Sequence, residues 1–268
     1  MKRIWLVLVV LVALAGLAFA QSAGVKQKQP KPYDFGTMTL NSRSTAAGMA
    51  PVTFEHWSHR AQYTCRLCHV DLGFAMKSGG TEITVADNQR GYYCGACHNG
   101  KVGPGGKTVF KACEKGSTAA EDPRCARCHQ RERDPARAEV FFLFAEKMPK
   151  ERLGNGINWE LAEEKGLIKP IDTLPGISIP RKPMAVQKDF ALESKVGGMP
   201  DIIFSHKKHT VWNGCEICHP DIFAGVQKGA TKYSMLDISA GKYCGMCHKT
   251  VAFPMQDCQR CHSKPVNS

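Results

Sequence analysis

Six copies of one five-residue pattern, Cys-x-x-Cys-His, account for twelve of the 13 cysteines in this chain of 268 residues. Each copy places two thiols one tight turn apart and puts an imidazole directly after the second thiol. This pattern is typical of covalent haem attachment, in which the thiols form thioethers with the haem vinyl groups and the histidine binds the iron as its proximal ligand. The copies are Cys65, Cys68 and His69; Cys94, Cys97 and His98; Cys125, Cys128 and His129; Cys215, Cys218 and His219; Cys244, Cys247 and His248; and Cys258, Cys261 and His262.

Structural zinc and disulfides are two other common uses of paired cysteines in proteins. Neither use requires a histidine directly after the second cysteine. Only 10 of the 268 residues are histidines, so a histidine at this place in all six copies is not expected by chance. The pattern therefore favours six covalently bound c haems over zinc or disulfides.

Cys113 is the one cysteine outside these motifs. Because every other cysteine is assigned to a haem, we expect it to have no disulfide partner. Three interpretations stay open: a spare thiol, an intermolecular link, and a sulfur ligand to the nearby haem of Cys125 and Cys128.

The chain contains an internal repeat with an offset of 150 residues. Over residues 54–98, adding 150 to a residue number gives the matching residue of the second copy. The first copy is then longer, since Cys125 follows Cys94 by 31 positions whereas the equivalent spacing in the second copy is 14. We interpret the extra length as a surface-loop insertion. The repeat predicts two trihaem modules, over residues 50–130 and 200–264.

The modules are joined by a connector, residues 131–199, which has neither cysteine nor histidine and so cannot ligate haem. Its sequence predicts one helix from Pro135 to Gly154, a second short helix within residues 158–166, and an extended proline-rich passage after it. A phenylalanine cluster at residues 141–144 is expected to pack against haem faces, with a docking patch for a partner as the alternative.

Six haems on a chain of this length leave little polypeptide for each cofactor. We therefore expect a loop-rich, mostly α-helical fold in which the haems themselves form the hydrophobic core of the two modules, joined by a partly helical connector. The 25 glycines and 15 prolines fit a wrapping of loops and short helices. Folding is expected to depend on haem insertion.

Residues 1–20 predict export from the cytoplasm. A basic start at Lys2 and Arg3, an apolar run and small residues at its end are typical of a cleaved secretory signal peptide, with an uncleaved anchor as the alternative. Residues 21–49 are then an N-terminal extension, and residues 265–268 are a short tail. The mature chain, without a stable membrane span, is expected in the periplasm, with the outer surface or the cell exterior as alternatives.

Four histidines lie outside the haem motifs and occur as one Phe-x-His-x-x-His unit ahead of each module. Residues three positions apart on a helical turn project from one face, so the two imidazoles of a unit can reach different haems. We interpret His56, His59, His206 and His209 as distal axial ligands. A structural or zinc-binding histidine pair is the alternative.

These features resemble the class III multihaem cytochromes of the cytochrome c3 superfamily, in particular the trihaem cytochrome c7 type and its tandem relatives. The resemblance rests on FEHWSH ahead of CRLCH, CGACH and CARCH, and on FSHKKH ahead of CEICH, CGMCH and CQRCH. It implies that the first histidine of each pair, His56 or His206, ligates the first haem of its module. It also implies that the second, His59 or His209, ligates the middle haem.

The third haem of each module lacks an obvious sixth ligand. Many members of the family have a histidine four residues before the middle motif, where this chain has Arg90 and Ala240. Some tandem relatives use methionine for this haem, and the resemblance makes Met235 the candidate distal ligand in the second module. Val85 aligns with Met235 in the first module, so Met76 is the substitute candidate there.

The expected ligands favour an electron carrier over an enzyme. An iron with two strong axial ligands has no place for a substrate, so electrons are expected to hop between closely spaced haems and to pass between redox protein partners. A multihaem reductase would need an open iron at a third haem, and a structural unit of an extracellular conductive assembly is a further interpretation. Haem propionates offset most of the formal charge of +12, so nucleic-acid binding is not indicated.

Overall fold

The computed structural model describes residues 30–101, 103, 108–114, 116–117, 121–182, 184–194, 196–225 and 227–264. The predicted signal peptide and C-terminal tail lie outside these ranges, as does part of the predicted loop insertion. Within the described ranges, no helix has both the length and the apolar character that crossing a membrane requires.

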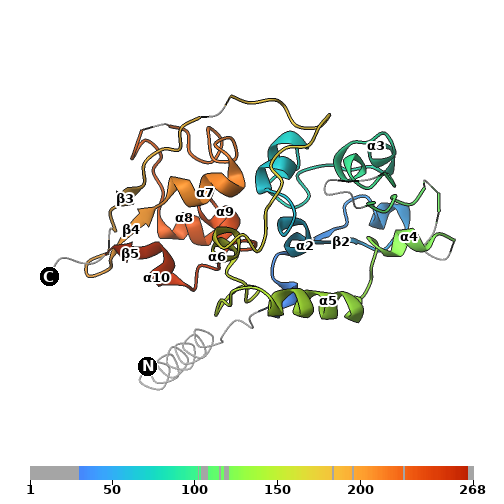
Figure 1. Cartoon of the computed structure of the whole chain (residues 1–268), viewed down its shortest axis with the longest axis horizontal. Helices are drawn as coiled ribbons and strands as arrows, with labels where there is room; N and C mark the ends of the chain where they lie inside the picture. The colour runs from blue at the N-terminus through green and yellow to red at the C-terminus, as the bar shows by residue number, and fades with distance from the viewer. Residues whose placement is uncertain are drawn as a thin grey trace, which may run out of the picture. The chain divides into compact units, whose positions relative to one another are not determined.

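A pair of antiparallel strands, one from the N-terminal extension and one from the first module, leads into the histidine helix of that module (Figure 1). Strand β1, Thr37–Leu40, pairs along its whole length with strand β2, Val52–Glu55. Helix α2, His56–Arg60, follows β2 directly. The paired strands therefore fix the point from which His56 and His59 project.

The other helical elements of this module are short. Three of them contain haem-motif residues, so the chain is helical where thiols and imidazoles must project from neighbouring positions. The elements are α3, Val85–Gln89; α4, Pro123–Ala126; a π-helical turn, Leu67–Asp71; and a 3₁₀ turn, Tyr93–Ala96.

The connector carries two helices. Helix α5, Pro135–Glu146, begins at the predicted proline, and the Asp134 side chain caps its first turn. It ends well before Gly154, so the predicted helix was too long. Helix α6, Trp159–Glu164, lies within the range predicted for the second helix.

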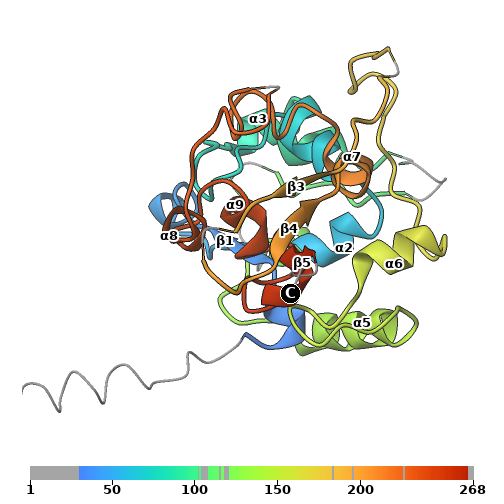
Figure 2. The same ribbon diagram turned by 90° about the vertical axis from the view of Figure 1, so that its left-hand side faces the viewer.

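In the second module a strand again leads into the histidine helix, and it lies between a strand of the connector and a strand that follows the last haem motif. Strands β3, Phe190–Leu192, β4, Asp201–Phe204, and β5, His262–Lys264, form an antiparallel sheet in the order β3-β4-β5, and Figure 2 shows the three side by side. Helix α7, His206–Asn213, follows β4 after the capping residue Ser205. The remaining helices are α8, Met235–Ser239; α9, Gly245–His248; and α10, Cys258–Cys261.

A conventional side-chain core lies where the connector helices meet α2 and α7. Phe141 packs against Trp57 with ring centroids 5.3 Å apart, and Phe144 lies between Trp57 and Trp159 at 5.5 and 6.0 Å. The buried members of this core are Trp57, Phe141, Ile157, Trp159, Ala162, Ile168 and Trp212.

Two members of the phenylalanine cluster, Phe141 and Phe144, pack on tryptophans of this core. The cluster does not line the large cavity described below, and its packing against haem faces stays a prediction. Phe142 is half exposed and contacts Tyr33 edge to face. Apolar side chains therefore form part of the hydrophobic core, in addition to any buried cofactor.

The middle haem motif has the same unusual backbone in both modules. A Cβ atom at Gly95 would lie 1.7 Å from a carbonyl oxygen of α3, and one at Gly245 would lie 1.8 Å from a carbonyl oxygen of α8. Glycine is needed at both positions because the motif passes so close to the preceding helix. Tyr93 and Tyr243 have φ angles of 47° and 51°, a left-handed conformation that is uncommon outside glycine.

The described residues thus form short helices and two small antiparallel sheets that are joined by long loops. The loop-rich prediction is confirmed. The prediction of a mostly α-helical protein is only partly correct, because the described residues also form two antiparallel sheets. Strands β2 and β4 of these sheets lead into the histidine helices of the two modules.

Candidate haem-binding site

One large cavity lies against the haem motifs of both modules. Its volume is about 2080 Å³, and small-molecule pockets usually have roughly 300 to 1,000 Å³. A cavity of this size with paired thiols along its wall fits several large cofactors better than one small ligand. Ten of the twelve motif cysteines line it: Cys65, Cys68, Cys94, Cys97, Cys128, Cys218, Cys244, Cys247, Cys258 and Cys261.

Nine of the ten histidines are oriented by the same kind of hydrogen bond. In each, Nδ1 lies 2.6 to 3.2 Å from a backbone carbonyl oxygen, which can only accept, so Nδ1 carries the proton. The Nε2 lone pair is then free for a metal, and this is the usual arrangement of histidines that bind metals. The nine are His56, His59, His69, His129, His206, His209, His219, His248 and His262.

Two pairs of imidazoles face one another at a distance that suits one iron between them. The ring centroids of His59 and His98 are 6.3 Å apart, and those of His209 and His248 are 6.2 Å apart. Metal–imidazole bonds are about 2.0 to 2.1 Å long, so two imidazoles on opposite sides of one metal have centroids about 6 Å apart. These are the distal and proximal histidines that the sequence assigns to the middle haem of each module.

The histidines assigned to the first haems line the large cavity in the first module and not in the second. In the first module, His56 and His69 both line the large cavity. In the second module, His206 and His219 lie outside the lining of the large cavity. The axial pairing of His206 therefore stays a prediction.

A phenylalanine ring separates the two histidines of each Phe-x-His-x-x-His unit. Phe54 lies edge-on to His56 at 4.8 Å and tilted over His59 at 4.5 Å. In the second module, Phe204 makes the same two contacts, with the same 4.5 Å distance to its second histidine. The phenylalanine thus keeps the two imidazoles apart, a role that the sequence analysis missed although the residue recurs in both units.

Burial keeps the candidate ligands in the neutral form that can bind a metal. Desolvation lowers the pKa of His56, His59 and His248 to about 4, and a backbone hydrogen bond opposes this shift only in part. The pKa values of His69, His98 and His209 are also lowered, again mainly by burial. All six imidazoles are therefore neutral near pH 7.

Burial raises the pKa of the thiols, whereas it lowers the pKa of the imidazoles. It raises the pKa of Cys68 and Cys247 to about 12, and the pKa of Cys94, Cys218 and Cys261 to about 11. These cysteines therefore keep their S–H bonds, the form in which a thiol adds across a vinyl double bond to give a thioether.

Both methionines proposed as distal ligands line the cavity. Met235, at the start of α8, is 50% exposed, so its thioether is accessible as well as adjacent to the cavity. Four more methionines, which the sequence analysis did not single out, also line the cavity: Met38, Met199, Met246 and Met255.

Cys113 is bonded to Cys125, so the prediction that Cys113 has no disulfide partner was wrong. The Cα atoms of the two residues are 5.1 Å apart. A sulfur atom cannot form a disulfide and a thioether at the same time. Attachment of a haem through Cys125 therefore requires the bond to Cys113 to open.

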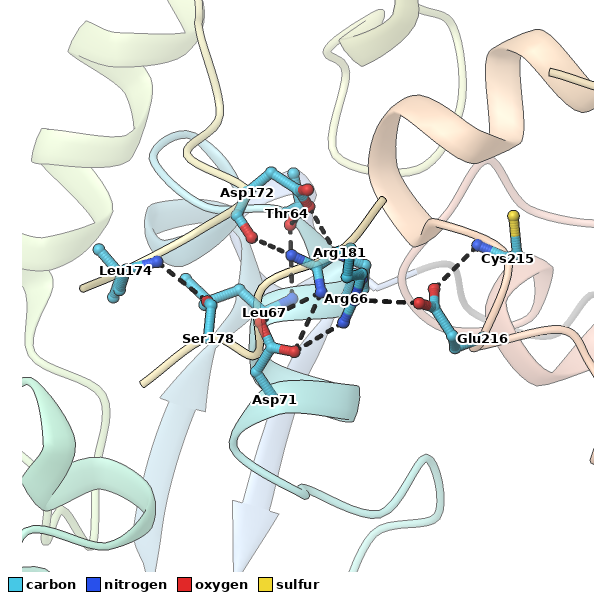
Figure 3. A network of polar contacts seen from close by, with 10 residues as sticks. All are labelled: Thr64, Arg66, Leu67, Asp71, Asp172, Leu174, Ser178, Arg181, Cys215 and Glu216. Carbon is cyan, nitrogen blue, oxygen red and sulfur yellow. Dashed lines mark hydrogen bonds and ion pairs between the residues drawn. The ribbon is translucent and has the colours of Figure 1, made fainter. Parts of the chain in front are cut away.

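A network of ion pairs joins the first haem motif of one module to that of the other (Figure 3). Arg66, inside CRLCH, binds Asp71 at 3.0 Å and Asp172 of the connector at 2.8 Å. Arg181, also in the connector, lies 2.7 Å from Asp71 and 3.0 Å from Glu216. Glu216 occupies in CEICH the position that Arg66 occupies in CRLCH.

This network is buried at its centre, where the side chains of Arg66 and Asp71 are 1% and 0% exposed. Gly214 permits the approach of the two motifs, since a Cβ atom there would lie 2.5 Å from Cδ of Arg66. The sequence analysis missed the network because two of its members belong to the connector, which has no haem motif. The network ties the two first-haem motifs together through charge-assisted hydrogen bonds.

Comparison with known proteins agrees with this chemistry. Residues 52–131 and 202–263, together more than half of the chain, match the family model described as cytochrome c7 and related cytochrome c. The two ranges correspond to the two copies of the repeat. No curated protein matches the chain.

Three solved structures resemble the chain in sequence. The C-terminal hexaheme fragment of GSU1996 is 25% identical, with 88% of this chain and 99% of that chain covered and a TM-score of 0.25. The N-terminal hexaheme fragment of GSU1996 is 23% identical, with 85% and 98% covered and a TM-score of 0.25. A c7-type three-heme cytochrome domain is 36% identical, with 30% and 99% covered and a TM-score of 0.27.

Because these TM-scores are low, the assignment rests on the family model and on the site, and not on superposition. The family model, the repeated Cys-x-x-Cys-His motifs and the thiol-lined cavity agree with the resemblance that the sequence implied. This chain is a multihaem c-type cytochrome and belongs to the cytochrome c7 family.

Proposed function

We propose that this protein is a hexahaem electron carrier in which single electrons hop between neighbouring haems. The observation that carries the proposal is the repeated pairing of His59 with His98 and of His209 with His248, at 6.3 and 6.2 Å, beside a thiol-lined cavity. An iron held by these two imidazoles would exchange electrons and would have no place for a substrate.

The residues of each motif have separate roles in holding a haem. The two thiols would add across the two vinyl groups, each S–H supplying its hydrogen to one vinyl carbon and its sulfur to the other. The following histidine would bind the iron through Nε2, and in five of the six motifs its Nδ1–H donates to a backbone carbonyl and fixes the ring. The haem supplies the one-electron iron couple.

The third haem of each module would use a different sixth ligand. All ten histidines are assigned to the six proximal positions and the four distal positions of the first and middle haems. Met235 and Met76 are our candidates for the third haems of the second and first modules, and both border the cavity. A thioether ligand would raise the potential of these haems relative to haems with two histidines.

We further propose that the mature protein works in the periplasm, with the cell exterior as the alternative, and receives and donates electrons through redox protein partners. The signal-like residues 1–20 support export. Covalent attachment supports the same location, since it keeps the cofactor bound in a dilute compartment.

Two measurements on the purified protein test this function. Intact mass counts the covalently bound haems, and we expect six. Carbon monoxide added to the reduced protein detects open irons, and we expect no haem to bind it readily. Fewer than six haems would refute the hexahaem proposal. Six haems of which one or two bind carbon monoxide would identify an open third haem and favour a reductase.

A further inference from the structure

Arg181, in the connector, bridges the segments around the first haem motif of each module (Figure 3). Its Nη2 lies 2.7 Å from Oδ1 of Asp71, and its Nε lies 3.0 Å from Oε1 of Glu216. Asp71 belongs to the π-helical turn that also contains His69, and Glu216 lies inside the CEICH motif. One side chain of the connector therefore joins the turn that carries a proximal histidine of one module to a haem motif of the other.

The contacts continue on both sides of Arg181. The other carboxylate oxygen of Glu216, Oε2, accepts a hydrogen bond from the backbone N–H of Cys215 at 3.1 Å. Asp71 also binds Arg66 of CRLCH at 3.0 Å, and its side chain is closed to solvent. Charged pairs that are shielded from water are screened less and interact more strongly than exposed pairs. The position of Cys215 is thereby tied to that of the first motif of the other module.

The two first motifs also touch directly. A Cβ atom at Gly214, just before CEICH, would lie 2.5 Å from Cδ of Arg66 in CRLCH. Other motifs pack within their own modules: the middle motifs approach α3 and α8, and His129 of a third motif bonds to the carbonyl oxygen of Ala50 at 2.6 Å. The described contacts thus bring together two first motifs that belong to different modules.

We propose that Arg181 sets the spacing between the first haems of the two modules, and with it the distance that an electron crosses between modules. The inference rests on the proposed haem attachment at Cys65/Cys68 and Cys215/Cys218, and it gives Arg181 a positioning role. The thioether edge of a haem lies at its cysteines, so motifs that touch would bring two such edges close together. Electron transfer becomes much slower as the distance between haem edges grows.

The test uses two variants of the full holoprotein, Arg181→Gln and Glu216→Gln, which break the same ion pair and change the charge in opposite directions. Arg133→Gln is the matched control, because Arg133 is also a connector arginine but pairs with Asp34 of the N-terminal extension. Intact mass counts the haems. The NMR signals of the haem methyl groups during a redox titration give the potential of each haem and its dependence on the oxidation state of its neighbours.

We expect the redox interaction between the two first haems to decrease in both variants and to stay unchanged in the control. The reason is that the Coulomb interaction between two charged irons weakens as their distance grows. The potentials of these two haems should become more negative in Arg181→Gln, which removes a positive charge, and more positive in Glu216→Gln. A purely electrostatic role of Arg181 would produce these opposite shifts without any loss of the interaction.

An interaction that is unchanged in both variants, or that changes with opposite sign in the two, would overturn the proposal. The proposal would also be overturned if the two first haems of the unmodified protein show no redox interaction, since electrons would then cross between modules elsewhere. If Arg181→Gln fails to fold, Glu216→Gln alone decides, because Glu216 is 41% exposed. Six attached haems would still be counted in these cases, so failure of this inference is distinct from failure of the proposed function.

Discussion

The two modules are nearly identical at the middle haem motif and differ most at the third. At the middle motif, the facing imidazoles are 6.3 and 6.2 Å apart and the preceding tyrosines have φ angles of 47° and 51°. At the third motif, the first module has an insertion and the Cys113–Cys125 bond, whereas in the second module the motif ends directly in strand β5. The modules therefore share the imidazole pair and the backbone of the middle motif and differ in structure at the third motif.

The largest expected effect is loss of a middle-haem ligand. We expect His59→Ala and His209→Ala each to open one iron, because each removes an imidazole that faces a proximal histidine. Carbon monoxide binding to the reduced protein should rise to one haem per molecule in either variant and to two in the double variant. A variant that binds no carbon monoxide would show that the two modules do not share this ligand.

The next effect in size is a difference in the free energy of unfolding between variants at the equivalent positions Arg66 and Glu216. Arg66→Gln should lower the free energy of unfolding by about 3 kcal/mol or more, because it leaves the buried Asp71 carboxylate with one partner fewer in a closed site. Glu216→Gln should cost about 1 kcal/mol or less, since Glu216 is 41% exposed. Denaturant unfolding of the two holoproteins measures both values, and equal losses would contradict this asymmetry.

Substitution of the glycines in the two middle motifs tests whether the close approach of each motif to the preceding helix is needed for stability. Gly95→Ala and Gly245→Ala should each lower the free energy of unfolding by about 1 to 3 kcal/mol, because the added methyl group overlaps a carbonyl oxygen. Gly197→Ala is the matched control, since nothing lies within 4 Å of a Cβ atom there. If either motif variant is as stable as the control, its close approach is not required.

The smallest effect concerns Cys113, which has no equivalent in the second module. If Cys125 holds a haem through a thioether, Cys113 must be a free thiol in the holoprotein. We therefore expect iodoacetamide to add one label to the unfolded holoprotein and none to Cys113 in the apoprotein, where Cys125 is its partner. Mass spectrometry of the labelled peptides distinguishes the two states. A holoprotein that carries six haems on two thioethers each but leaves Cys113 unlabelled would contradict this account.

The sequence predicted the parts of the site that depend on spacing along the chain. The six haem motifs, the histidine pairs and the 150-residue repeat are local patterns, and the structure brings His59 and His209 to the imidazoles that the resemblance implied. The ion pair of Asp172 with Arg66 joins residues 106 positions apart, and the disulfide partner of Cys113 lies outside any repeated motif spacing. Periodicity and spacing carry no information about such contacts.

The sequence did not predict the two sheets, because their strands are short and pair with segments elsewhere in the chain. Strands β1 to β5 have only three or four residues each, so alternation within them is too short to recognise. Their stability comes from pairing with strands elsewhere, as β5 pairs with β4 after the last haem motif.

In the proposed protein, four irons carry two histidines each and the third haem of each module carries a different sixth ligand. Near-infrared magnetic circular dichroism of the fully oxidised protein distinguishes these ligand sets by the energy of the charge-transfer band. We expect intensity from four haems with two imidazole ligands and from two haems with a different sixth ligand. Six haems with two imidazole ligands, or fewer than four, would contradict the assignment of His56, His59, His206 and His209.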